Sequence, residues 1–177
     1  MKTKSFKILV VFLTLQVKAQ LETPGSFRKA IFIEAFGQGL QASVNYNMRL
    51  MLGAQDGIGF RVGVGGIFTC TANADAGNEM KGVLAFPIGL NYLMGKNKSS
   101  FEAGLGLTPH YADTVIDSPT NPEIIEENGW GANGYLNVGY RFQPPDNGFM
   151  FRLNWTPVIS STGFLAQNFG VSAGYSF

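Results

Sequence analysis

Residues 40–50 read Leu-Gln-Ala-Ser-Val-Asn-Tyr-Asn-Met-Arg-Leu, and apolar and polar side chains alternate along the whole stretch. Val44 and Leu50 belong to the apolar set, whereas Asn45 and Arg49 belong to the polar set. Successive side chains of a β-strand point to opposite faces, so a period of two predicts a strand with one apolar face. An amphipathic helix would repeat its apolar residues at three and four positions, which this stretch does not do.

The same alternation returns along most of the chain and predicts eight antiparallel strands. The expected strands cover residues 30–36, 40–50, 58–64, 84–94, 101–107, 136–142, 149–155 and 169–177. Short connections rich in Gly, Asn, Asp and Pro are expected at 53–56, 95–100 and 143–148, and long loops at 69–81, 109–130 and 157–167. Residues 37–39 form the one tight turn among the long loops. Short turns at one end and long loops at the other are typical of outer-membrane barrels, whose short turns face the periplasm.

Two closed sheets fit this alternation, and they differ in which face is outside. A soluble calycin-like barrel would enclose a ligand within its apolar face, whereas a membrane barrel would turn that face to lipid. Only 14% of the residues are charged, against about 25% in an average soluble domain. The polar faces of the expected strands consist mostly of Gly, Ser, Asn and Thr and contain no lysine, which makes a poor water-facing surface. The sequence therefore predicts an all-β protein, an eight-stranded antiparallel up-and-down transmembrane β-barrel.

The amino terminus resembles an export signal. Lys2, Lys4 and Lys7 precede the apolar run 8–13, and Val17 and Ala19 stand where a signal peptidase prefers small residues. The run is far shorter than the roughly 20 residues that a membrane-spanning helix needs. We expect a signal peptide at 1–19, an N-terminal periplasmic segment at 20–27 and a single barrel domain at 28–177.

Charge and cysteine content exclude several classes of protein. The formal net charge of the whole chain is +1, and cleavage of the signal would remove four lysines, so there is no basic stripe for a nucleic acid. Cys70 is the single cysteine, which excludes an internal disulfide and a multi-cysteine metal site. We interpret Cys70 as an incidental thiol.

Aromatic residues gather toward one end of the expected strands. If the chain runs up and down from a periplasmic start, nine outward-facing aromatic side chains fall near the periplasmic end and predict a girdle at that membrane interface. These residues are Phe60, Tyr92, Phe101, Tyr140, Phe142, Phe149, Phe151, Tyr175 and Phe177. The opposite girdle is thinner, and its candidates are Phe36, Phe68, Phe86 and Trp155.

The last expected strand, residues 168–177, has aromatics at alternate positions and a terminal Phe177. It resembles the signal by which the barrel-assembly machinery recognises outer-membrane barrels. The region 28–177, with the blocks 139–144 and 151–157, is similar to small eight-stranded barrels of the OmpA-transmembrane and OmpX type and to an uncharacterised outer-membrane β-barrel family of Gram-negative bacteria. The resemblance implies insertion into the cell outer membrane, with lipid, lipopolysaccharide and the assembly machinery as partners.

Strand phase directs six charged side chains into the barrel. They comprise two acids and four bases: Glu34, Glu102, Arg49, Arg61, Arg141 and Arg152. An unpaired charge in so narrow a space would cost several kcal/mol, so ion pairs or trapped water are required. Eight strands leave no open channel, and we therefore favour a structural plug of ion pairs over an ion pathway.

Residues that carry catalysis or bind metals are scarce. His110 is the only histidine, and the chain lacks a His-x-Ser arrangement that would place a nucleophile beside a base. The region 109–130 contains five acids and no base, but their spacing matches no calcium loop. We interpret the region as a solvated acidic loop, and predict no catalytic residue, metal site or cofactor.

The sequence thus predicts a monomeric integral outer-membrane barrel without an open pore, with a structural, adhesive or ligand-contacting role carried by its extracellular loops. Two alternatives remain open. The first is a lipid-modifying enzyme that acts on the acyl chains of lipid A, and the second is a small diffusion channel.

Overall fold

The computed structural model describes residues 27–177 except 74–76, 96, 119–120 and 162. For 68–73, 77–81, 113–118 and 121–128 it describes the backbone alone. The predicted signal peptide at 1–19 lies outside the described residues, as does the segment 20–26. The first strand begins at Phe27, one residue earlier than the expected barrel boundary.

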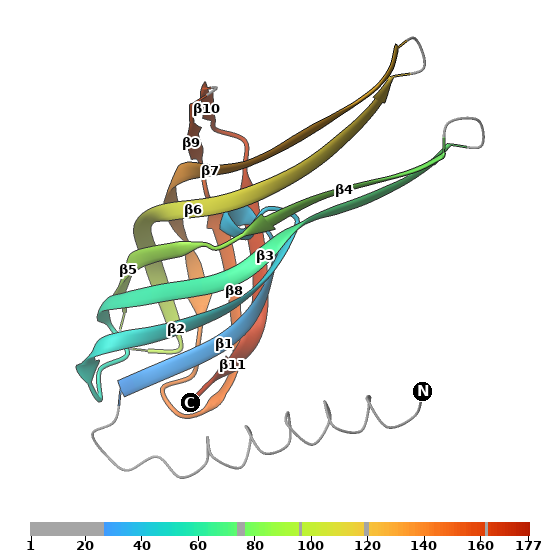
Figure 1. The fold of residues 1–177 in the computed structure, drawn as a ribbon. Coiled ribbons are helices and arrows are strands. Elements are labelled where there is room, and N and C mark those ends of the chain that lie inside the picture. Colours follow the sequence, from blue (N-terminus) through green and yellow to red (C-terminus); the bar gives the residue numbers. More distant parts are fainter. Residues whose placement is uncertain (1–26, 74–76, 96, 119–120, 162) are drawn as a thin grey trace, which may run out of the picture.

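A closed barrel of eight antiparallel strands confirms the predicted fold (Figure 1). β1 (Phe27–Phe36) pairs with β2 (Ala42–Leu52) on one side and with the last strand, β11 (Phe169–Ser176), on the other, which closes the sheet. The wall continues through β3 (Gly57–Asn73), β4 (Gly77–Ala85), β5 (Ile88–Met94), β6 (Ser99–Ser118), β7 (Asn121–Phe142) and β8 (Gly148–Trp155). A short hairpin of β9 (Val158–Ser160) and β10 (Gly163–Leu165) follows β8.

β4 and β5 occupy the place of the single strand expected at 84–94. The strand is interrupted at Phe86 and Pro87, because proline has no N–H to offer to a β-ladder. The backbone hydrogen bonds are shared around the break: the N–H of Gly63 donates to the Pro87 carbonyl at 2.9 Å, and the N–H of Phe86 donates to the Pro109 carbonyl at 2.8 Å. Both halves therefore remain in the barrel wall.

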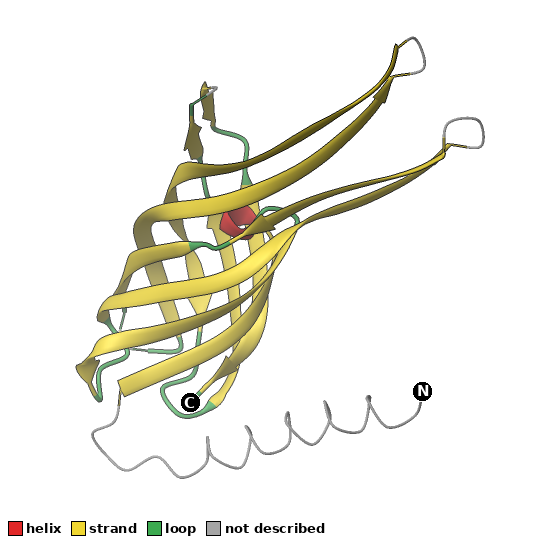
Figure 2. Ribbon diagram, viewed as in Figure 1, coloured by secondary structure: helices red, strands yellow, loops and turns green. Residues whose placement is uncertain are grey.

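The described residues of the long loops expected at 69–81 and 109–130 are β-strand instead, so that expectation was wrong. β3 and β4 pair from Gly65↔Ala85 to Asn73↔Gly77, and β6 and β7 pair as far as Ser118↔Asn121. Figure 2 shows both hairpins projecting well beyond the barrel as strand. The alternation of apolar and polar residues fails along these segments because a hairpin beyond the barrel has no apolar neighbour to face. Backbone pairing continues the strands there.

The barrel is polar inside and apolar outside. The fully buried side chains are mainly Arg, Glu, Asn, Gln, Ser and Thr, whereas the apolar core cluster consists of Ala30, Phe32 and Met150. Ile, Leu, Val and aromatic side chains are exposed on the outer surface of every barrel strand. Within the described residues, no helix combines the length and the apolar character that a membrane crossing requires.

Candidate functional site

The interior charge cluster consists of Glu34, Glu102, Arg49, Arg61, Arg141 and Arg152. Each of these side chains is at most 3% exposed, and each lies on the inward phase of its strand. Because charged groups are so costly to bury, their pairing decides whether this interior is stable. The cluster divides into two halves around its two carboxylates.

Glu102 on β6 is the carboxylate at the centre of the larger half of the interior charge cluster. Arg152 donates two parallel hydrogen bonds to this carboxylate, from Nε to Oε2 at 3.1 Å and from Nη2 to Oε1 at 2.8 Å. Arg141 lies farther away, with its Nη1 at 3.5 Å from Oε2. The side-chain amides of Asn91 and Asn137 donate to Oε1 at 3.0 and 3.1 Å. Two guanidinium groups and two amides therefore converge on one carboxylate.

Glu34 on β1 forms the smaller half with Arg61 of β3. Arg61 donates to the Glu34 carboxylate through Nη2, and its Nε and Nη2 also donate to the Asn45 side-chain oxygen at 3.0 and 2.8 Å. Phe32 lies between the two halves: the guanidinium carbons of Arg61 and Arg152 are 5.2 and 4.8 Å from its ring centroid. A buried aromatic ring between two cations stabilises both of them.

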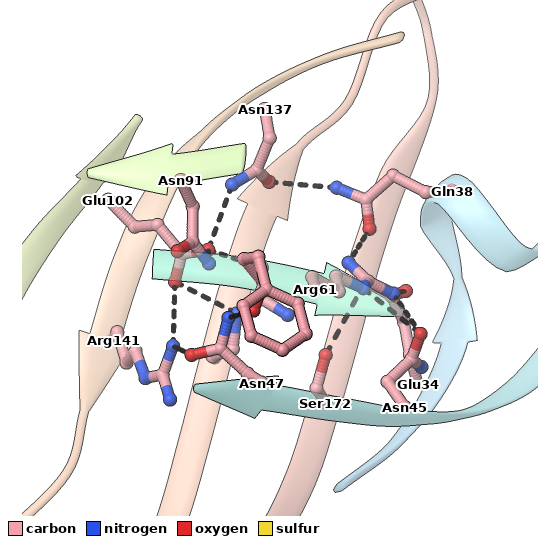
Figure 3. Close-up of polar contacts among 12 residues, drawn as sticks. Glu34, Gln38, Asn45, Asn47, Arg61, Asn91, Glu102, Asn137, Arg141 and Ser172 are labelled. Carbon is pink, nitrogen blue, oxygen red and sulfur yellow. Dashed lines mark hydrogen bonds and ion pairs between the residues drawn. The ribbon is translucent and has the colours of Figure 1, made fainter. Parts of the chain in front are cut away.

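Gln38 and Asn137 join the two halves, and Figure 3 shows Asn137 between Gln38 and Glu102. The Gln38 amide donates to the Asn137 side-chain oxygen at 3.0 Å, while its own oxygen accepts from Arg61. A continuous chain of hydrogen bonds thus runs from Glu34 to Glu102 across the barrel. Sequence reasoning missed Gln38, since it lies in a tight turn where strand phase gives no direction, and also missed Phe32, which the phase of β1 directs inward beside Glu34.

Arg49 differs from the other three arginines in its partners. Its guanidinium donates to the Gly57 carbonyl at 3.1 Å, to the Asn47 side-chain oxygen at 2.7 Å and to the Asn91 side-chain oxygen. Gly59 lies directly beneath this guanidinium, where a Cβ atom would collide with it. In the described part of the chain the hydrogen-bond partners of Arg49 are neutral oxygens, so its charge is not paired in direct contact.

A buried glutamine lies at each end of the barrel, Gln38 at one end and Gln55 at the other. At the end with the long hairpins, η1 (Gly37–Gly39) folds inward, and the Gln38 carbonyl accepts a hydrogen bond from Thr108 at 3.0 Å. At the end with the short turns, the Gln55 amide donates to the carbonyls of Gln143 at 2.6 Å and of Asn97 at 3.2 Å. The interior between them retains a cavity of about 10 Å³, which is the space of about one water molecule. Gln38, Arg61 and Glu102 are among the side chains that line this cavity.

The inward turn is held between two strained residues. Phe36 has φ 60° and ψ −155°, and Leu40 has φ 68° and ψ −122°. Such backbone angles are nearly exclusive to glycine, and each costs of order 1–3 kcal/mol for another residue. The Asn168 amide donates to the Gly37 carbonyl at 3.1 Å and so ties the turn to the β11 side of the barrel.

The nine aromatic residues expected near the short turns lie on the outer face, in or directly after the strand segments that adjoin those turns. Phe60, Phe142, Phe151 and Phe177 are half-buried, and the other five side chains are exposed. Several stand directly opposite each other on neighbouring strands, as in the pairs Phe101↔Tyr140 and Phe149↔Tyr175. We call this set the short-turn aromatic row.

A second aromatic group marks the other end of the outer face. Trp130 is 70% exposed, and its ring lies 5.5 Å from Tyr111 and 6.3 Å, stacked, from Phe86. We call these three residues the hairpin-end aromatic group. Trp130 and Tyr111 were missed by sequence reasoning because both fall within the region 109–130 that was expected to be a loop.

His110 and Cys70 lie on the two long hairpins. The Nδ1 atom of His110 lies 3.3 Å from the Thr108 backbone carbonyl, and the imidazole covers Gly131 of β7. Cys70 is opposite Met80 in the register of β3 and β4. The acidic side chains expected in the loop 109–130, Asp113 to Glu127, lie outside the side chains described. Within the described residues no three acidic, histidine or cysteine side chains gather as a metal site would require.

Among known proteins, the chain resembles solved structures in its fold. No protein-family profile and no curated protein sequence matches the chain. The fold is similar to the N-terminal β-barrel domain of OprF from Pseudomonas aeruginosa, with a TM-score of 0.56, 11% identity and coverage of 88% of this chain and 100% of that one. It is also similar to Ail, the attachment invasion locus protein of Yersinia pestis, solved with the heparin analogue sucrose octasulfate, with a TM-score of 0.57, 13% identity and coverage of 86% and 99%. The resemblance to small eight-stranded outer-membrane barrels is confirmed as a likeness of fold.

Proposed function

We propose that the chain is an integral outer-membrane barrel without an open pore, which contacts ligands or other surfaces through its projecting hairpins. The observation that carries the proposal is the inverted polarity of the barrel. A closed sheet satisfies every backbone N–H and C=O group internally, which is what a lipid environment demands. An apolar outer surface around a buried polar interior suits hydrocarbon as the neighbour, and water on that surface would be unfavourable.

The two long hairpins supply the contact surface. β4 and β6 pair from Gly82↔Asp113 to Ala85↔His110, so the hairpins share one sheet at their base. The pairing of β2 with β3 ends at Gly66, and beyond it the described residues provide no neighbour for the outer edge of β3. An exposed strand edge accepts a further strand from a partner. One of the similar folds, Ail, is an attachment protein, which supports the same role here.

The charge of the β6–β7 hairpin suggests the chemistry of the partner. Its sequence from 109 to 130 carries five acids and no base, so a cationic or neutral surface is favoured over a polyanion. In this respect we expect the chain to differ from a protein that binds a heparin analogue.

Location and orientation are tested with epitope tags in the full chain expressed in a Gram-negative host. A tag between residues 119 and 120 is expected to bind antibody on intact cells, whereas a tag at Asp146 in a short turn is expected to require permeabilised cells. The protein should fractionate with the outer membrane and migrate faster on a gel when unheated than when boiled. A chain found in the soluble fraction would overturn the proposal.

The contact role is tested by replacing 113–128 with a short turn. Cells with the intact chain should adhere more strongly to polylysine-coated plastic than cells with the shortened chain, and neither should adhere to immobilised heparin. Equal adhesion of the two chains on polylysine would remove the contact role and leave the membrane location intact.

A further inference from the structure

The β9–β10 hairpin is apolar, unlike the other hairpins at its end of the barrel. Ile159, Phe164 and Leu165 are 51%, 62% and 56% exposed, and the hairpin contains no charged residue. Exposed apolar side chains that gather on a short segment normally mark a surface that something covers. The question is which neighbour covers this one.

Strand register places Ile159 and Phe164 on the outer wall of the barrel, whereas Leu165 and Val158 have the opposite phase. Ile159 stands opposite Phe164 in β10 and opposite Gly134 in β7. Residues directly opposite each other in antiparallel strands share a face of the sheet. Gly134 has the same phase along β7 as Leu136 and Trp130, both of which point outward. Ile159 and Phe164 therefore continue the outer apolar surface of the barrel.

The register also fixes the level of the hairpin on that wall. Along β6 and β7, Gly134 pairs with Leu107, the pair Phe101↔Tyr140 belongs to the short-turn aromatic row, and Tyr111↔Trp130 belongs to the hairpin-end aromatic group. The attachment point of β9 thus lies between the two aromatic levels, within the apolar band. Bands of this kind, with aromatic girdles at both borders, are the lipid-contacting belts of membrane barrels.

Hydrogen bonds hold the hairpin and its return segment to the barrel wall. The N–H of Leu136 donates to the Pro157 carbonyl at 3.0 Å, where the chain enters β9. The indole N–H of Trp155 donates to the Ala166 carbonyl at 2.6 Å, where the chain leaves β10. At the tip, the Ser160 hydroxyl lies 3.2 Å from the Gly163 carbonyl. Because hydrogen bonds attach the hairpin to the barrel wall at both ends, the outer face of the hairpin contacts the same surroundings as that wall.

We propose that the β9–β10 hairpin is immersed at the outer leaflet of the membrane, with Ile159 and Phe164 among lipid acyl chains and the polar tip at the headgroups. This inference rests on the proposed membrane location. Continuity with the apolar wall selects lipid as the occupant, because the same lipid that covers Leu136 reaches the hairpin without a separate partner. The hairpin thereby acts as an anchor beside the two projecting hairpins, which point away from the barrel (Figure 1).

The test measures the depth of a fluorescent label in a lipid bilayer. In a Cys70→Ser background, which removes the single native cysteine, Phe164→Cys is labelled with bimane and the full mature chain is inserted into phosphatidylcholine vesicles. Quenching by a nitroxide on the lipid acyl chain is compared with quenching by aqueous iodide. Leu153→Cys on the barrel wall is the lipid control, and Asp146→Cys in an exposed turn is the water control. Ile159→Cys provides a second position on the hairpin, and each variant is checked for heat-modifiable migration.

The label at Phe164 is expected to be quenched by the lipid nitroxide as strongly as the label at Leu153 and to be shielded from iodide. Iodide quenching at Phe164 and Ile159 that equals that at Asp146, with Leu153 still quenched by lipid, would overturn the anchor and leave the membrane location intact. Shielding from both quenchers would mean that protein, such as a second copy of the chain, covers the hairpin, and would also overturn the anchor. Iodide access at Leu153 would instead overturn the proposed membrane location.

Discussion

The two buried carboxylates of the barrel are surrounded very differently. Glu102 lies between two arginines and two asparagines, and Arg152 holds it with a bidentate pair. Glu34 has one arginine, Arg61, and otherwise contacts the Ser172 hydroxyl at 3.5 Å. In a low-dielectric interior, removing a carboxylate leaves each cation that it paired buried without a counter-charge, which lowers the stability of the fold. The Glu102 half is therefore organised around a shared anion, whereas the Glu34 half is a single ion pair beneath an inward turn.

The largest effect is expected for Glu102→Gln. This change leaves Arg141 and Arg152 buried with no directly bonded carboxylate, and we expect it to lower the free energy of unfolding by about 3–5 kcal/mol. Urea-induced unfolding in detergent micelles, followed by the loss of heat-modifiable migration, measures the change. The control is Asp146→Asn in an exposed short turn, which should unfold like the parent chain. Unchanged unfolding of Glu102→Gln would show that the shared carboxylate does not hold this half together.

A smaller loss is expected for Glu34→Gln. Arg61 would lose its carboxylate but keep the Asn45 oxygen and the Phe32 ring, so the expected cost is about 2–3 kcal/mol. In a double-mutant cycle, Arg61→Met should recover part of this cost, because it removes the cation left unpaired. Simple additivity of the two substitutions would contradict a direct pair, and a cost equal to that of Glu102→Gln would remove the difference between the halves.

The inward turn above Glu34 contains strained backbone, whereas the described surroundings of Glu102 do not. Leu40→Gly places a residue that tolerates positive φ at a position with φ 68°, and we expect a gain of about 1 kcal/mol in the free energy of unfolding. Leu50→Gly, within a regular strand, is the matched control and should be destabilising. Equal losses at both positions would mean that the turn carries no strain.

The smallest effect is expected for Arg49→Met. Because the hydrogen-bond partners of Arg49 are neutral oxygens, replacing it with an apolar side chain of similar length should change the free energy of unfolding by less than about 1 kcal/mol. Arg152→Met, which strips Glu102 of its bidentate partner, should cost several times more. The ratio of the two midpoint shifts in urea measures this contrast, and similar losses would place Arg49 among the required cations of the Glu102 half.

Residue alternation together with the low charge content of the sequence was sufficient to predict the barrel. A period of two along residues 40–50 and its repeats predicted eight strands with two opposite faces, because successive side chains in a strand alternate in direction. The low charge content then assigned the polar face, with Glu34, Glu102 and the four arginines, to the inside of the barrel. The alternation signal failed at 69–81 and 109–130, where strands continue without an apolar face. Parity could also have indicated Phe32, but it had no information about Gln38 in its turn.

Alternation and composition together were therefore enough to predict which side chains face inward and which face outward. Only the tertiary structure decided the pairing, namely that Arg61 meets Glu34, that Arg152 meets Glu102, and that Gln38 and Asn137 connect the two. The physical reason is that parity is a local property of one strand. A contact across the barrel depends on strand stagger, barrel closure and the path of the β1–β2 turn, which arise only when all eight strands are assembled.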